Sequence, residues 1–139
     1  MGIETQFEIA VAAVAKLEQL HSQFMQQVAA LNPSKIEGAE LSVNNGELRA
    51  VCLGVPLQTI HRPVVSDGHL MSVEYGFRTK LGDEEFLVCA MYLEANGNLY
   101  SDSVSQELIC QSGNTYLPQR LAPWLAASLL QSKVFAASK

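Results

Sequence analysis

Residues 3–31 have the sequence IETQFEIAVAAVAKLEQLHSQFMQQVAAL, which predicts one long amphipathic helix. Thr5 and Glu8 have the spacing of a capping box at the start of this helix. Pro33 disfavours helical geometry at Asn32, so we expect the helix to end at Leu31. Two neighbouring lines with a period of seven form its apolar stripe, and they consist of Phe7, Val14, His21 and Val28 and of Ile3, Ala10, Leu17, Phe24 and Leu31.

The apolar stripe is wider than the contact line of a two-stranded coiled coil. Ile9, Val11, Leu20 and Met25 extend it sideways. A wide stripe is typical of a helix that packs on a broad surface. We therefore expect the helix to lie on a β-sheet.

The next segment, residues 39–99, has the pattern of antiparallel hairpins. Asn44-Asn45-Gly46 separates the short apolar runs 41–43 and 48–53, and Asn-Gly supplies the positive φ angles of a tight turn. After Gly54 and Pro56, residues 57–61 predict a third strand, which we expect Pro63 to end because proline cannot donate to a ladder.

Two further strands follow. Residues 71–78 alternate apolar and polar side chains, which indicates a strand with one buried face. Residues 86–93 are apolar throughout, so we expect a central strand that is covered on both faces. Asn96-Gly97 predicts a hairpin into Leu99 and Tyr100.

The last third of the chain predicts a helix from Pro123 to Ser132, because Leu121, Trp124, Leu125 and Leu129 recur at helical spacing. Residues 103–112 fit either a short helix or an edge strand, and the choice stays open. The expected fold is a single α+β domain over residues 1–139. It has a long N-terminal helix on an antiparallel β-meander of about five to six strands, and a short C-terminal helix.

Composition excludes several functions. The chain has 139 residues, 48% of them hydrophobic, and a net charge of -5, so we expect neither nucleic acid nor an anionic membrane as partner. The first eight residues contain two acids and no base, unlike a secretory signal. Cys52, Cys89 and Cys110 lie far apart in apolar surroundings, which is typical of buried free thiols. These features favour a cytoplasmic protein.

The densest group of reactive side chains lies between residues 59 and 69. His61, Arg62, Asp67 and His69 are the candidates for a ligand site, either as metal ligands or as a base oriented by Asp67. The spacing matches no zinc pattern, and Ser66-Asp67-Gly68 is ordinary turn chemistry. We therefore expect no catalytic residue, no metal and no cofactor here.

A comparison of lengths points to self-association. At ~1.5 Å per residue the first helix spans about 39 Å, whereas an eight-residue strand at ~3.3 Å per residue spans about 26 Å. The apolar stripe would extend past the sheet, and large exposed apolar patches are rare on monomers. We expect a homodimer, with interface candidates Phe7, Val14, His21, Phe24 and Val28.

The sequence thus favours a small, non-enzymatic cytosolic protein with an adaptor-like or chaperone-like role in protein binding. The helix-first antiparallel sheet is loosely similar to the folds of secretion chaperones, although no helix is predicted between the third and fourth strands. The alternative is a small-ligand-binding protein or an enzyme whose pocket uses His61, Asp67 and His69. His21 is expected to be a neutral core or rim histidine that is hydrogen-bonded through one nitrogen, which we favour over a pH switch.

Overall fold

The computed structural model describes residues 2–31, 34–66, 69–101, 107–111 and 114–137. It begins with helix α1, Ile3–Ala29, whose N-cap is Gly2. The prediction of a capping box is wrong, because Thr5 already lies inside the helix and the N-cap makes no side-chain hydrogen bond. The helix is followed by Ala30 as its C-cap and stops two residues before Leu31.

Eight antiparallel strands form one sheet in which each strand pairs with the next in sequence. The predicted meander is therefore confirmed, but the expected five to six strands are too few. The strands are β1 Lys35–Ile36, β2 Ala39–Asn44, β3 Glu47–Cys52, β4 Val55–Ser66, β5 His69–Leu81, β6 Glu84–Glu94, β7 Asn98–Tyr100 and β8 Leu108–Gln111.

Two tight turns fix the register of the first hairpins. Asn45 and Gly46 connect β2 to β3 with φ angles of 54° and 76°, which confirms the predicted turn. Leu53 and Gly54 connect β3 to β4 with φ angles of 53° and 79°. Gly54 therefore lies in a second hairpin turn, directly before β4.

Strand β4 is longer than predicted because Pro63 does not end it. Pro63 lies opposite Val73 of β5, and β4 continues to Ser66. The pairing of β3 with β4 reaches only from Val55 to Gln58, so beyond Gln58 one side of β4 has no paired strand in the described chain. Proline is tolerated on such an unpaired side because no ladder bond is lost there.

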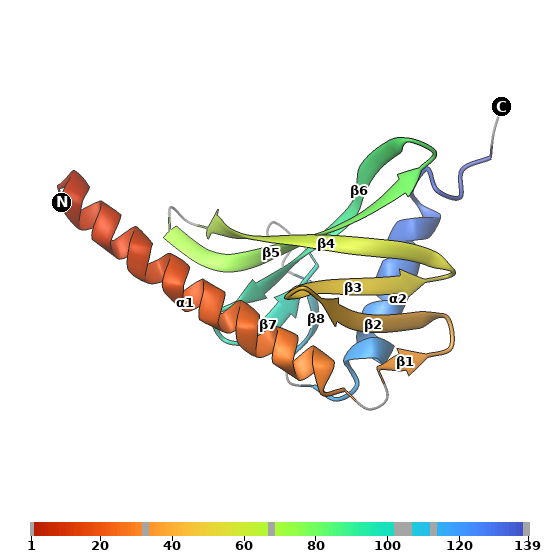
Figure 1. Ribbon diagram of the computed structural model, residues 1–139, viewed down its shortest axis with the longest axis horizontal. Coiled ribbons are helices and arrows are strands. Elements are labelled where there is room, and N and C mark those ends of the chain that lie inside the picture. Colours follow the sequence, from red (N-terminus) through yellow and green to blue (C-terminus); the bar gives the residue numbers. More distant parts are fainter. Residues whose placement is uncertain (1, 32–33, 67–68, 102–106, 112–113, 138–139) are drawn as a thin grey trace.

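The sheet is curled, and both helices cover its inner face (Figure 1). Helix α2, Leu117–Leu130, contacts β1 at one edge of the sheet and β8 at the other. Neither of the two helices in the described part of the chain lies on the outer face, so the expectation that residues 86–93 are covered on both faces is wrong. Met91 and Leu93 are buried, whereas Leu87 of the same strand is 50% exposed.

Helix α2 begins six residues before the predicted Pro123, and Pro118 occupies its first turn. Leu117, Leu121, Leu125 and Leu129 recur every fourth residue and are fully buried against the sheet. Of the segment left open, the described residues 108–111 form a strand, while residues 103–106 and 112 lie outside the described residues.

The first half of α1 projects beyond the sheet, as Figure 1 shows. Ile3 is 85% and Phe7 is 68% exposed, and the first buried residue of the helix is Leu17. From Leu17 onward the same stripe packs on the sheet. No helix among the described residues is both long enough and apolar enough to span a bilayer.

Candidate functional site

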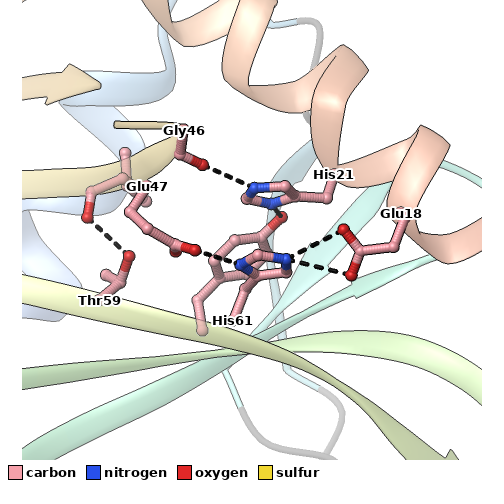
Figure 2. Close-up of polar contacts among 8 residues, drawn as sticks. Glu18, His21, Gly46, Glu47, Thr59 and His61 are labelled. Carbon is pink, nitrogen blue, oxygen red and sulfur yellow. Dashed lines mark hydrogen bonds and ion pairs between the residues drawn. The ribbon is translucent and has the colours of Figure 1, made fainter. Parts of the chain in front are cut away.

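Four elements bring polar side chains together where α1 crosses the sheet (Figure 2). Glu18 and His21 lie one turn apart on α1, and Glu47 follows the β2–β3 turn. His61 of β4 pairs with Tyr75 of β5 across the sheet. We call these five residues the histidine cluster.

His21 is only 5% exposed, and both of its ring nitrogens are hydrogen-bonded within the protein. Its Nε2 lies 2.7 Å from the carbonyl oxygen of Gly46, and its Nδ1 lies 2.8 Å from the hydroxyl of Tyr75. A carbonyl oxygen only accepts, so we assign the ring hydrogen to Nε2. Nδ1 then accepts from Tyr75, and the neutral ring is fully satisfied.

His61 lies between two carboxylates. Its Nδ1 is 2.5 Å from an oxygen of Glu47, and its Nε2 is 3.2 Å from each carboxylate oxygen of Glu18. Carboxylates accept hydrogen bonds and do not donate them when ionised. Only the doubly protonated ring of His61 donates to both partners.

The two imidazole rings stack face to face. Their centroids are 3.6 Å apart and their planes differ by 5°. Beneath them, Phe24 meets the ring of Tyr75 edge-on at 5.5 Å. Tyr75 therefore stacks near both imidazole rings and is itself packed against Phe24. The carboxylates of Glu18 and Glu47 contact the ring nitrogens of His61.

Burial is the main cause that lowers the pKa of His21 below its usual 6.5, and the neighbouring His61 acts in the same direction. The bond to Gly46 and the charges of Glu47 and Glu18 oppose this shift without cancelling it. Burial also raises the pKa of the Tyr75 phenol, so its hydroxyl keeps its hydrogen. The expectation that His21 is buried and hydrogen-bonded is confirmed, and both of its ring nitrogens are bonded where one was expected.

A shared metal ion does not fit the observed ring geometry. His21, Glu47 and His61 each have an N or O atom within 4.8 Å of the others. However, the lone pair of an imidazole nitrogen lies in the ring plane, and the two planes are almost parallel. An ion bound by both rings would lie outside at least one plane. The second oxygen of Glu47, Oε2, is buried without a hydrogen-bond partner among the described residues.

The sequence candidates for a ligand site separate in the structure. His61 joins the histidine cluster, whereas Arg62 lies on the opposite face of β4 and donates to Glu74 at 2.9 Å. Partial burial raises the pKa of Glu74, but the hydrogen bonds from Arg62 and Tyr92 outweigh it and leave that pKa lowered. Asp67 lies outside the described residues, as does the side chain of His69.

Sequence reasoning missed Glu18, Glu47 and Tyr75 as members of the cluster. The signals available in the sequence were His21, the polar residue on the apolar stripe, and His61, in the densest group of reactive side chains. Glu18 precedes His21 by one helical turn, a spacing that is visible in the sequence, whereas Glu47, His61 and Tyr75 come from three strands that only the pairing register places together. Local spacing contains no record of that register.

Among the five interface candidates, two lie on the projecting half of α1. Phe7 is 68% and Val14 is 36% exposed. Phe24 and Val28 are in the core, and His21 is in the histidine cluster.

A cavity of about 290 Å³ lies beside β4 and β5, away from the histidine cluster. This volume is at the lower end of the range for small-ligand pockets. Its lining residues are Pro56, Gln58, Arg78, Thr79, Lys80 and Glu85.

Comparisons with models of known protein families, with curated protein sequences and with solved structures find no match for this chain.

Proposed function

We propose that this protein acts by associating with protein, and that it forms a homodimer through the projecting half of α1. The observation that carries the proposal is the exposure of large apolar side chains on one face of the helix there: Ile3, Phe7 and Val11 follow one another at four-residue steps and are each more than half exposed. Contiguous apolar surface of this kind marks interaction sites on soluble proteins. A cytoplasmic location and an adaptor-like or chaperone-like role belong to the same proposal.

The shape of the molecule favours an antiparallel pairing of two helices. Ile3, Phe7 and Val14 lie on the helix face that, from Leu17 onward, is covered by the protein's own sheet. A parallel partner would follow this face into the sheet. In an antiparallel pair, the partner's helix begins before it reaches Leu17. The half of that helix which is covered by its own sheet lies beyond Ile3, so the two sheets do not collide.

The paired segment would be short. Residues 3–14 span about 18 Å of helix at ~1.5 Å per residue. The area buried by such a contact is small for a specific interface. Transient interfaces bury about 1,200 Å² or less in total. We therefore expect the homodimer to exchange with monomer at micromolar protein concentrations.

Light scattering coupled to gel filtration tests the proposal. The wild-type mass should rise with concentration from the 15.1 kDa of one chain toward twice that value. Phe7→Glu should remain monomeric, because a charge in the contact is costly to bury. Ala12→Glu is the matched control, since it adds the same charge about 140° around the helix from Phe7.

The control should associate like the wild type, and circular dichroism melts should show both variants folded. A wild-type mass of 15.1 kDa at every concentration would contradict the proposal. So would a Phe7→Glu variant that associates as well as Ala12→Glu.

A further inference from the structure

We propose that the stacked His21–His61 pair is a proton-controlled clamp between α1 and the sheet. The clamp holds the helix when one of the two rings is a doubly protonated cation and the other is neutral. It loosens when the second ring is protonated as well. The clamp joins α1 to the β2–β3 turn and to β4 at the point where the helix leaves the sheet. Its influence on association rests on the proposed function, whereas its proton count does not.

Counting donors and acceptors supports the singly charged pair. With His61 doubly protonated and His21 neutral, the four relevant hydrogens all meet acceptors. His61 donates to Glu47 and Glu18, His21 donates to Gly46, and Tyr75 donates to His21. A fully satisfied buried network of this kind specifies one arrangement of its elements.

A second proton would disrupt that arrangement. On Nδ1 of His21 it would point at the oxygen of Tyr75 and reverse that hydrogen bond, so the Tyr75 hydroxyl would lose its acceptor. It would also place two cations in rings whose centroids are 3.6 Å apart. Glu18 and Glu47 are the charged groups that face the pair, and both are already engaged by His61.

The loss of one proton from the pair is also unfavourable. A neutral His61 has one N–H, so either Glu18 or Glu47 would face a bare ring nitrogen. The other carboxylate oxygen of Glu47, Oε2, is buried without a hydrogen-bond partner in the described part of the chain, and the hydrogen bond from His61 to Oε1 holds this carboxylate near the pair. The geometry therefore accommodates one proton in addition to those of two neutral rings.

The position of the clamp connects it to the projecting half of α1. Glu18 and His21 are within four residues of Leu17, the first residue of the apolar stripe that packs on the sheet. Loosening the clamp lets the projecting half change its direction relative to the sheet. A contact that depends on this direction then weakens in acid.

Ring-nitrogen NMR on ¹⁵N-labelled protein tests the proton count directly. The variant His69→Gln leaves only His21 and His61, since the chain has three histidines. In a titration from neutral to acidic pH, we expect His61 to carry both ring hydrogens while His21 is still the Nε2–H tautomer. The second proton should bind His21 about one pH unit or more lower, as expected for strongly interacting sites.

Simultaneous protonation of the two rings, or protonation of His21 first, would overturn the proposal. A rise in melting temperature on addition of Zn²⁺ alone that His69→Gln keeps and His21→Gln loses would also overturn it, because it would show that the rings turn to share a metal.

His21→Gln separates the clamp from the association. Glutamine keeps an N–H donor for Gly46 but takes up no proton. Between pH 7.5 and 5.5 we expect the dissociation constant of the wild-type dimer to rise about tenfold, the effect of about 1.4 kcal/mol. That of His21→Gln should change less than about twofold, while His69→Gln should behave like the wild type.

Equal acid sensitivity in wild type and His21→Gln would overturn the clamp. If the wild type is monomeric at every pH, the proposed function fails, and the NMR titration still decides the proton count.

Discussion

The hydroxyl of Thr59 in β4 donates a buried hydrogen bond of 2.6 Å to the carbonyl of Leu48 in β3. Paired β3 and β4 residues reach only from Cys52 and Val55 to Arg49 and Gln58. The Thr59 side chain thus prolongs the contact between the strands by one residue beyond the backbone ladder. It supports the strand segment that carries Glu47 and His61 into the histidine cluster.

Thr59→Val should lower the free energy of unfolding by about 1–3 kcal/mol, because the Leu48 carbonyl loses its partner in a buried position. Thr59→Ser keeps the hydroxyl and should lose much less. Urea unfolding of the three proteins measures the difference. A Val variant as stable as the Ser variant would show that water replaces the hydroxyl.

His21→Leu should destabilise the protein at neutral pH by about 1–3 kcal/mol, since Gly46 and Tyr75 each lose a hydrogen-bond partner. The pKa of His21 is lowered in the folded state, so the unfolded chain takes up this proton first. The wild type therefore loses stability as the pH falls below about 6.5, and the deficit of the Leu variant should narrow. Melts at matched salt that show a constant difference would contradict this linkage.

The three cysteines should react slowly with a thiol reagent in the native protein. Burial raises the pKa of Cys89 to about 12 and that of Cys110 to about 11, and it also raises the pKa of Cys52. The reactive thiolate is therefore scarce at neutral pH. Labelling should accelerate strongly in guanidinium, and fast labelling of native protein would mean that a thiol is accessible.

Gly46→Ala should cost about 1–2 kcal/mol of stability through backbone strain, because Gly46 has a φ of 76°. No atom lies within 4 Å of the added Cβ, so steric overlap does not contribute. Gly2→Ala is the control, because Gly2 has a φ of -75° and equally open surroundings. Equal melting temperatures for the two variants would show that the β2–β3 turn relaxes without strain.

Local patterns predicted the elements that depend on local chemistry. The period of the apolar stripe identified α1, and Asn45-Gly46 identified the first hairpin. Pro63 misled the prediction because its effect depends on whether a strand pairs on that side of β4, which is a non-local property. The exposure of Leu87 was not predicted for the same reason, since the sequence does not say which face of the sheet the two helices cover.

The candidate site was predictable only in part. His61 was identified because reactive residues are dense around it, and His21 because it lies on the apolar stripe. Their stacking depends on the register of two hairpins and on the axial position of α1. Such long-range geometry is fixed by the whole core and not by the spacing of residues along the chain.

The curling of the sheet around α2 also limits how this protein can aggregate. Its terminal strands β1 and β8 have two and four residues, and α2 contacts both. Longer strand segments that pair on one side only in the described chain include the end of β4, where Pro63 removes one donor, and residues 84–91 of β6, because β7 pairs only with Tyr92 and Leu93. At β1 and β8, a strand from another molecule therefore finds few backbone groups to which it can add. Edge-to-edge growth from the two terminal strands is disfavoured, even at concentrations where the helices of two copies meet.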